Sequence, residues 1–335
     1  MHNSFADYLR AHHGDLDEYL LSFFEGTAET DDLNRYLYAP LRSFAENGGK
    51  RHRPLICLLA CRAVGGDPAL ARSCAAAIEH FQSAALIHDD IADNGQLRRG
   101  KPCLYLTEGV GLAINCGDLD LTLVTEAVLN DPVLPDDVRL RVMRELTAMT
   151  MRTIEGQALD LGWVRDGRFD LTVDDYLRMA TLKTAHYSGA VPLAAGAIIG
   201  GGSTEQVEAL RSFGLDTGLA FQIQDDLINL LGNDTAKDFR TDITEGKRTL
   251  VAVHALADPA AHDEVEAILR SGTSDPAVLA RCVELFEQSG SIAYAHGVAE
   301  DLITRAKETL AGIELDEGCR ALFLDMADFF LDRAS

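Results

Sequence analysis

Apolar residues recur at helical spacing along most of the chain, whereas the alternation typical of strands is nearly absent. One apolar stripe, which includes Phe81 and Ile87, ends at Asp89. Aspartate caps free backbone amides and proline suits a first turn, so Asp67-Pro68 predicts the start of this helix. The pattern predicts an all-α protein.

Two capping boxes predict further helix starts, one at Thr172 with Asp175 and one at Ser203 with Gln206. The segments between the predicted helices are short, and no stretch resembles a linker, a repeat or a low-complexity tail. We therefore expect residues 1–335 to form a single all-helical domain.

Composition narrows the possible partners. The chain has 335 residues, of which 47% are hydrophobic, enough for a sizeable core. Its formal net charge of −23 argues against nonspecific binding of nucleic acid and against docking on an anionic membrane. The N-terminal residues are polar, unlike a signal peptide, and the most apolar run, Ala190 to Ile199, is too short to span a bilayer. We expect a cytoplasmic protein without a transmembrane segment.

Seven cysteines are scattered along the chain without a CxxC pair. This pattern favours buried, reduced thiols over a disulfide or zinc framework. The cysteines are Cys57, Cys61, Cys74, Cys103, Cys116, Cys282 and Cys319.

Adjacent aspartates occur five times, and their positions within the predicted helices differ. Three pairs, which begin at Asp31, Asp136 and Asp174, open predicted helices, where negative charge suits the helix dipole. The pairs at Asp89 and Asp225 instead follow apolar helical segments. At these places the helix dipole disfavours negative charge, and desolvation costs on the order of several kcal/mol per uncompensated ion. The negative charge of those two pairs must therefore be balanced by another group or ion.

Spacing suggests what balances them. Asp89 and Asp93 are four residues apart and share one helical face, as do Asp225 and Asn229. Several oxygen ligands on one face suit Mg²⁺, which also takes substrate phosphate oxygens. The alternative is a pair of solvated helix faces with salt bridges.

The segment Asp89 to Asp93, followed by Arg98 to Pro102, resembles the first aspartate-rich motif of trans-isoprenyl diphosphate synthases in the polyprenyl synthetase family. The resemblance extends from about Gly48 to Thr249. It implies an isoprenoid synthase-type helical bundle around a central cavity, and a homodimer. It also implies that the chain condenses isopentenyl diphosphate with an allylic diphosphate and releases pyrophosphate.

The resemblance assigns substrate contacts by matching motifs. The isopentenyl diphosphate would be held by Lys50, Arg53, Gln82 and Arg99. The allylic diphosphate and the leaving pyrophosphate would be held by Arg98, Lys183, Thr184, Gln222, Lys237 and Lys247.

The resemblance also implies a magnesium site, with a trinuclear cluster that includes the substrate diphosphate. Its ligands would come from Asp89, Asp90, Asp93, Asp225, Asp226 and Asn229. The residues expected to act in catalysis are Asp89, Asp93, Arg98, Lys183, Asp225 and Lys237.

The implied reaction is an ionisation followed by carbon–carbon bond formation. Magnesium and the basic side chains would neutralise the charge that develops on the departing pyrophosphate. The cations from Lys50 to Arg53 precede Pro54, which suggests the start of a helix. Cations are unfavourable at that end, and a bound anion would resolve the conflict.

Two positions depart from the family pattern. Asn229 stands where the second motif normally ends in aspartate, and Arg240 stands where many members have glycine. An amide oxygen can still coordinate a cation, so we expect retained activity with one weaker metal site. The polar segment from Asn233 to Lys247, which contains Arg240, is expected to be a loop.

Product length depends on the side chains before the first motif. The fourth and fifth residues before Asp89 are Ala85 and Ala84, which are too small to form a floor there. Phe81 lies about 5 Å deeper along the helix axis, comparable with one isoprene unit. We therefore expect geranylgeranyl diphosphate, the twenty-carbon product, with Phe81 as a candidate floor. The alternative is that Phe81 is ordinary core packing and another helix sets the limit.

Two other functions remain open at this point. A class I terpene cyclase shares the helical bundle and one aspartate motif, but it needs no isopentenyl diphosphate site. A catalytically weak partner subunit of an active synthase would explain Asn229.

Overall fold

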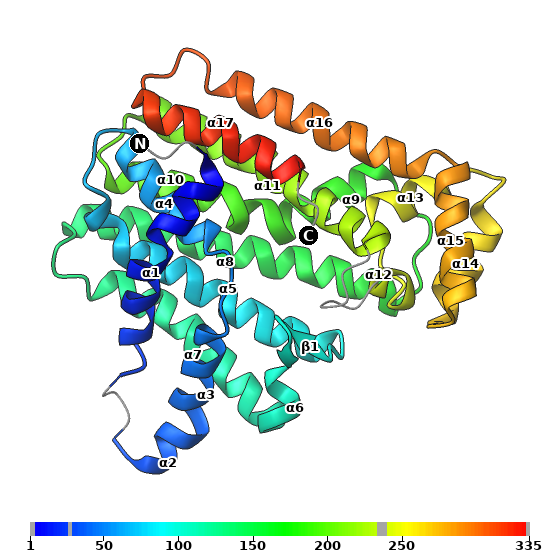
Figure 1. Ribbon diagram of the computed structural model, residues 1–335, viewed down its shortest axis with the longest axis horizontal. Coiled ribbons are helices and arrows are strands. Elements are labelled where there is room, and N and C mark those ends of the chain that lie inside the picture. The colour runs from blue at the N-terminus through cyan, green and yellow to red at the C-terminus, as the bar shows by residue number, and fades with distance from the viewer. Residues whose placement is uncertain (1–3, 26–28, 233–239, 333–335) are drawn as a thin grey trace. The chain divides into compact units, whose positions relative to one another are not determined.

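The computed structural model describes residues 4–25, 29–232 and 240–332 (Figure 1). These residues are almost entirely helical, as the apolar spacing predicted. The only strands in the described ranges are β1 (Leu97–Arg98) and β2 (Lys101–Pro102), which pair antiparallel in a short hairpin. The protein is all-α.

The helices form two compact units of packed residues. The first unit comprises residues 1–148, 191–211 and 312–325, and the second comprises residues 149–190, 212–311 and 326–335. Three of the unit boundaries fall within long helices, α8 (Asp136–Arg165), α11 (Thr204–Leu231) and α17 (Glu317–Leu331). The single domain inferred from the sequence stays a prediction.

Besides the hairpin and its parts of the shared helices, the first unit contains α1 (Phe5–Ser22), α2 (Asp31–Leu33), η1 (Asn34–Tyr38), α3 (Ala39–Glu46), α4 (His52–Ala63), η2 (Pro68–Ala71), α5 (Arg72–Ala92), α6 (Leu104–Glu108), α7 (Val110–Leu129) and α10 (Val191–Ile199).

The second unit contains α9 (Val173–Ala180), η3 (Thr181–Ala190), α12 (Thr241–Thr244), α13 (Leu250–Leu256), α14 (His262–Ser271), α15 (Pro276–Gln288) and α16 (Ser291–Thr309), with the remaining parts of α8, α11 and α17.

Helix α5 is the central element of the first unit. Its residues Ala75 to Ile78 are fully buried, because the helix packs against α7, α4 and α1. Small side chains let these helices approach closely, and larger ones, such as Ile87, fill a cluster with residues of α3, α6 and α7. In Figure 1, α5 and α7 run side by side. This packing fixes the end of α5, where the first aspartate motif lies.

In the second unit, α13 is the most enclosed short helix. Its side chains Leu250 to Val253 are buried, and it packs against α16, α14, α9 and α15. Figure 1 shows α12, α13, α14 and α15 as neighbouring elements. Thr249 caps α13, so the chain that follows the second aspartate motif is anchored at its far end.

Several local predictions are confirmed. The capping box at Thr172 is complete, and Ser203 and Gln206 exchange the two expected hydrogen bonds, at 2.8 and 3.2 Å. Asp31 and Asp136 are each the first residue of a helix, and Asp174 lies in a first turn. All seven cysteines are buried and free.

Two boundaries differ from the prediction. Asp67 caps the single 3-10 turn η2, and the α-helix that carries the first motif begins only at Arg72. The second difference is in the segment from Asn233 to Lys247, which was expected to be a loop. It contains the short helix α12, because Arg240 reverses the chain and residues 241–244 close one helical turn. Residues 233–239 lie outside the described part of the chain. No helix within that part has the length and apolarity needed to cross a membrane.

Candidate active site

The first aspartate motif lies at the carboxyl end of α5. Asp89 and Asp93 are half-buried, and the Asp93 backbone N–H caps the helix by donating to the Asp89 carbonyl at 2.8 Å. The four-residue spacing puts both on one side of the last turn. The predicted position, at the end of an apolar helix, is confirmed. Because carbonyl groups end the helix here, these carboxylates need a cation nearby.

Asp90 is placed differently from its two neighbours. Its side chain is 2% exposed, and Arg98 of β1 donates to its Oδ1 atom from Nε at 2.9 Å and also from Nη2. Burial lowers the pKa of Arg98, but the hydrogen bond and charge of Asp90, together with the other negative groups nearby, leave it raised. The other carboxylate oxygen of Asp90 is buried and has no hydrogen-bond partner among the described residues. Arg98, expected to contact the allylic diphosphate, therefore pairs with the aspartate motif.

Arg99 is part of a cluster of guanidinium groups in the first unit. It donates to the Gly48 carbonyl, and a Cβ atom on Gly49 would lie 2.7 Å from its Nη2 atom. Burial lowers the pKa of Arg99, and the nearby charges of Arg51, Arg98 and Arg53 lower it further, against the opposing effect of Glu79. Guanidinium groups gathered in this way suit an anion.

Arg51 holds the loop that carries this cluster. Its backbone is left-handed, with φ of 48°, at the N-cap of α4. Its guanidinium is buried and pairs with Asp17 at 2.8 Å and with Glu79, and it also donates to the Ala45 carbonyl. These contacts over-determine a strained turn. Arg53 lies in the first turn of α4. Lys50, which directly precedes Arg51 in the chain, is exposed.

Four further residues predicted for the first unit lie on α5. Gln82 is 7% exposed, and its amide oxygen is buried without a hydrogen-bond partner among the described residues. Ala84 is fully buried, Ala85 is half-buried, and Phe81 is 3% exposed. Ala85 and Phe81 succeed one another at four-residue intervals below Asp89, as the helical spacing required.

In the second unit, two predicted lysines share one buried carboxylate. Asp160 of α8 accepts from Lys183 Nζ at 2.6 Å and from Lys247 Nζ at 3.2 Å. Burial alone would raise the pKa of Asp160, but the two ammonium groups hold it below its ordinary value. Gly156, one turn earlier, makes the pairing possible, because a Cβ atom there would overlap the Lys183 backbone nitrogen.

Asp226 is the centre of a polar network between helices of the second unit. Tyr176 Oη donates to its Oδ2 atom and Gln222 Nε2 donates to its Oδ1 atom, both at 2.7 Å. Thr184 Oγ1 in turn donates to Oε1 of the Gln222 side chain. Burial and the charge of the half-buried Asp225 raise the pKa of Asp226 to about 7, despite these hydrogen bonds. Four predicted residues therefore come together here.

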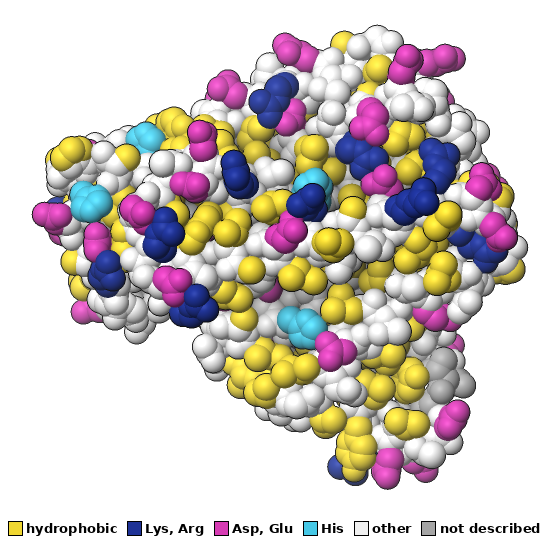
Figure 2. All heavy atoms as spheres, turned by 180° about the vertical axis from the view of Figure 1, so that it is seen from behind, with side chains coloured by type: hydrophobic (Ala, Val, Ile, Leu, Met, Phe, Trp, Pro, Cys, Tyr) yellow, Lys and Arg dark blue, Asp and Glu magenta, His cyan; other side chains and the backbone are white. Residues whose placement is uncertain are grey.

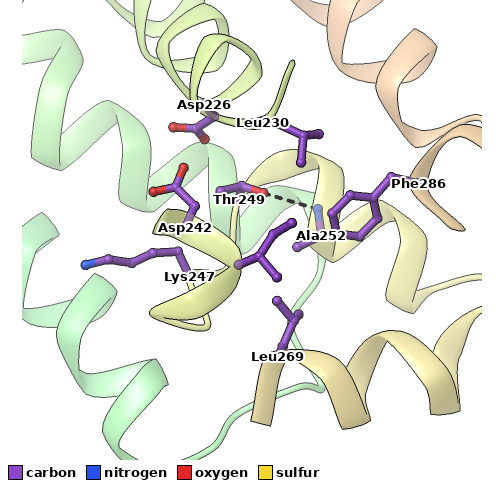
Figure 3. Close-up of a pocket in the computed structure, with 9 residues that line it drawn as sticks. Asp226, Leu230, Asp242, Lys247, Thr249, Ala252, Leu269 and Phe286 are labelled. Carbon is purple, nitrogen blue, oxygen red and sulfur yellow. Dashed lines mark hydrogen bonds between the residues drawn. The ribbon is translucent and has the colours of Figure 1, made fainter. Parts of the chain in front are cut away.

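Asp226 also lines a small pocket with Asp242 and Lys247 (Figure 3). Its free volume, about 10 Å³, is room for about one water molecule. In Figure 3 the two carboxyl groups and the lysine lie on one side, and Leu230, Leu269 and Phe286 form the apolar remainder. Burial and the charges of Asp226 and Glu245 raise the pKa of Asp242 well above its ordinary value. Two carboxyl groups and one ammonium group line this pocket, so the negative groups outnumber the positive one there.

Asn229 ends the second motif and contacts the chain that follows. Its Nδ2 atom donates to Thr241 Oγ1 at 2.8 Å, and its Oδ1 atom accepts from the Asp242 backbone N–H at 3.3 Å. Its backbone carbonyl accepts from the Arg240 N–H at 2.9 Å. The side-chain amide therefore bonds to the first two residues of α12 through both of its polar atoms.

Comparison with known proteins decides the family. The sequence model of the Polyprenyl synthetase family matches residues 34–286, most of the chain. The chain belongs to the polyprenyl synthetase family. It is 38% identical over 288 residues to the short chain isoprenyl diphosphate synthase of Methanothermobacter thermautotrophicus, covering 85% of this chain and 87% of the relative. It is 36% identical to the geranylfarnesyl diphosphate synthase of Natronomonas pharaonis, covering 89% and 90%.

A solved structure agrees with these sequence relatives. The geranylgeranyl pyrophosphate synthase of Corynebacterium glutamicum, complexed with isoprenyl diphosphate and magnesium, superposes with a TM-score of 0.89 at 28% identity. The match covers 99% of both chains. This member of the polyprenyl synthetase family is accordingly a prenyltransferase that makes a linear isoprenyl diphosphate from isopentenyl and allylic diphosphates.

The structure adds three residues to the candidate site of this polyprenyl synthetase that sequence reasoning missed: Asp160, Tyr176 and Asp242. Asp160 carries the signal that singled out the two aspartate pairs, an acid between apolar residues within a helix, but it stands alone. Tyr176 carries no signal. Lys237, predicted to contact the leaving group, lies outside the described residues.

Proposed function

We propose that this polyprenyl synthetase condenses isopentenyl diphosphate with an allylic diphosphate to make geranylgeranyl diphosphate, with magnesium as the metal. The observation that carries the proposal is the cluster of Arg51, Arg53 and Arg98 around Arg99. A synthase must bind a second diphosphate, whereas a terpene cyclase has no use for such a site. Several guanidinium groups gathered in this way suit the binding of a diphosphate.

The isopentenyl diphosphate is assigned to Lys50, Arg53, Gln82 and Arg99. Arginine pairs with phosphate oxygens through two parallel hydrogen bonds, and the exposed Lys50 adds a mobile charge. Gln82 can donate its amide group to the same ligand. Holding the nucleophile in one orientation lowers the barrier to attack on the allylic carbon by proximity.

The allylic diphosphate is assigned to Arg98, Lys183, Thr184, Gln222 and Lys247, and Lys237 joins them by resemblance. Lys183 and Lys247 are held by Asp160 at positions where they neutralise the charge that develops on the leaving group. The bond from the allylic carbon to oxygen breaks, isopentenyl diphosphate attacks the cation, and a proton leaves. The released pyrophosphate accepts that proton.

The carboxylates of both clusters fit a hard divalent cation. The buried oxygen of Asp90 lacks a hydrogen-bond partner among the described residues, and burial together with the charge of Asp226 raises the pKa of Asp242. Asp89, Asp93 and Asp225 would hold magnesium, with Asp90, Asp226 and Asp242 supporting them, in a trinuclear cluster completed by substrate. When bound, magnesium neutralises negative charge on the diphosphate.

Substrate oxygens belong to this proposed metal site. Within the described ranges, no three His, Cys, Asp or Glu side chains lie close enough together to hold a metal alone. This suits magnesium, which is usually bound by one or two carboxylates together with substrate phosphates and water.

One incubation tests the reaction. Purified protein, magnesium and labelled isopentenyl diphosphate are combined with each allylic primer, and the products are identified by chromatography. We expect elongation to the twenty-carbon diphosphate. No isopentenyl incorporation with any primer would refute the synthase assignment and favour an inactive partner subunit. A cyclic hydrocarbon made from a primer alone would identify a cyclase.

The proposed product length rests on Phe81 as the floor beneath Ala84 and Ala85. The geranylgeranyl product of the Corynebacterium relative supports it, whereas the Natronomonas relative makes the longer geranylfarnesyl diphosphate. We expect Phe81→Ala to lengthen the main product by at least one isoprene unit. Phe5→Ala, which removes an equally buried ring in α1, should lower stability without lengthening the product. Unchanged product length in Phe81→Ala would dismiss Phe81 as the floor.

We also propose a homodimer. Val110 and Ile114 share one face of α7, and with Leu106 of the adjoining α6 they are exposed apolar side chains. Figure 2 shows that hydrophobic side chains reach the surface in several places on the face drawn there. Light scattering after size exclusion should give twice the chain mass, and Ile114→Glu should reduce it. A monomeric native protein would refute the dimer.

The proposed location is the cytoplasm. Its support is chemical: all seven thiols are free and buried, which suits a reducing compartment. Fractionation of cells with an antibody against the native chain tests it, and recovery from an oxidising compartment would refute it.

A further inference from the structure

The two departures from the family pattern, Asn229 and Arg240, meet in one turn of the second unit. Arg240 donates its backbone N–H to the Asn229 carbonyl at 2.9 Å, and the next two residues bond to the Asn229 amide. Asn229, near the end of α11, thus bonds through its backbone carbonyl and its side-chain amide to three consecutive residues that are more than ten positions further along the chain. We call these three hydrogen bonds from Asn229 to residues 240–242 the clamp.

The turn that this clamp holds is strained. Arg240 has φ of 55°, in the left-handed region, at the N-cap of α12. An arginine in that region is disfavoured relative to glycine, and such conformations persist only where surrounding contacts enforce them. Asn229 supplies these contacts through Thr241 Oγ1 at 2.8 Å and the Asp242 backbone N–H at 3.3 Å.

The clamp sets the position of Asp242. The carboxyl group of Asp242 lies with that of Asp226 on one side of the pocket in Figure 3. Its backbone is also fixed from the other side, because its carbonyl accepts from the Lys247 N–H at 2.8 Å. Because the backbone of Asp242 is held on both sides, its carboxylate has little freedom to leave the cluster.

We propose that Asn229 is a positioning residue, which fastens the Arg240–Asp242 turn and so places the Asp242 carboxylate, rather than a ligand of the metal. The amide accomplishes this without adding a further negative charge beside Asp226 and Asp242. Asp242 supplies the carboxylate that the second motif lacks at its last position. The inference rests on the proposed function, which assigns a divalent cation to this cluster.

Thr241→Val tests the clamp while leaving position 229 intact. It removes the hydroxyl that accepts from Asn229 with little change in volume. Binding of Mn²⁺ is measured by electron paramagnetic resonance in the presence of inorganic pyrophosphate, and thermal unfolding is followed on metal-free protein. We expect Mn²⁺ affinity to fall about tenfold, as for other groups that orient a ligand, and the unfolding temperature to fall slightly. Thr241→Ser should restore both.

Thr244→Val is the matched control in the same short helix. Thr244 Oγ1 donates to the Thr273 carbonyl at 2.9 Å, away from Asn229. It should lower the unfolding temperature without changing Mn²⁺ affinity. Equal losses of affinity in the two variants, or native affinity in Thr241→Val, would overturn the positioning role alone. A native chain that bound no Mn²⁺ would overturn the metal assignment and this inference with it.

Discussion

The two aspartate clusters solve the problem of buried negative charge in different ways. In the first, Asp90 is neutralised by Arg98, only eight residues along the chain, and Asp89 and Asp93 flank it at the end of α5. In the second, Asp226 is held by neutral donors, Tyr176 and Gln222, and carboxyl groups accumulate around it. The buried carboxylate of the first cluster is thus paired with a cation close along the chain, whereas that of the second is held by neutral donors.

The comparison shows which cluster has a further carboxylate that could replace a lost metal ligand. Removing one carboxylate from the first cluster leaves few alternatives, because Asp90 is already paired with Arg98. Removing Asp225 from the second leaves Asp226 and Asp242 close to one another. The cluster that looks incomplete in sequence gains a carboxylate in space, that of Asp242.

The largest expected effect tests the difference between the two aspartate clusters directly. Asp89→Asn should lower kcat by on the order of 10² to 10³, because it removes preorganised charge stabilisation of the leaving group. Asp225→Asn should lower kcat by less, since other carboxylates remain. Steady-state kinetics across a magnesium titration measures both. Asp174→Asn, in the first turn of α9, is the control and should leave kcat unchanged. A greater loss in Asp225→Asn than in Asp89→Asn would contradict the comparison.

A second prediction concerns the carboxylate that the lysines share. Asp160→Asn leaves the Lys183 and Lys247 ammonium groups without their buried counter-charge, so the free energy of unfolding should fall by about 3 kcal/mol. Chemical denaturation measures this. Pyrophosphate should raise the unfolding temperature of the variant more than that of the native chain, because it replaces the lost charge.

The matched control for Asp160 is Glu145, which pairs with Arg211 at 2.7 Å in a more exposed setting in the first unit. Glu145→Gln should cost at most about 1 kcal/mol and show no special response to pyrophosphate. Similar losses in the two variants would mean that Asp160 acts as an ordinary surface partner.

The smallest expected effect comes from comparing the loss of a hydrogen bond to a carboxylate with the loss of a hydrogen bond to a neutral carbonyl group. Tyr176→Phe removes a donor to Asp226 and should lower the free energy of unfolding by about 2 kcal/mol. Tyr8→Phe removes the donor to the Leu55 carbonyl and should cost about 1 kcal/mol. Only Tyr176→Phe should change the magnesium concentration needed for half-maximal rate. A similar magnesium shift in Tyr8→Phe would show that the shift reflects stability alone.

The sequence predicted well what depends on neighbours along the chain. Helical spacing gave the all-α fold, and the residue types at Thr172 and Ser203 gave their caps, because these structures form from nearby residues. The position of Asp89 at a helix end followed in the same way. The first motif and its link to Arg98 lie within one helix and the following hairpin.

What the sequence could not supply depends on contacts between distant segments. Tyr176 and Asp226 are 50 positions apart, and Lys247 and Asp160 are 87 apart. No periodicity marks such partners, since they are chosen by how helices pack. The short helix α12 was missed because its turn is enforced by Asn229 rather than by local propensity. Lys237 stays a prediction.

The π-helical segment η3, from Thr181 to Ala190, has a consequence for protein engineering. In an ordinary helix, adding or deleting one residue rotates everything beyond it by about 100° about the axis. Lys183 and Thr184 lie inside η3 and reach different partners, Asp160 and Gln222. Single-residue insertions or deletions in this stretch would turn one of the two side chains away, so libraries of length variants should exclude it while sampling substitutions freely.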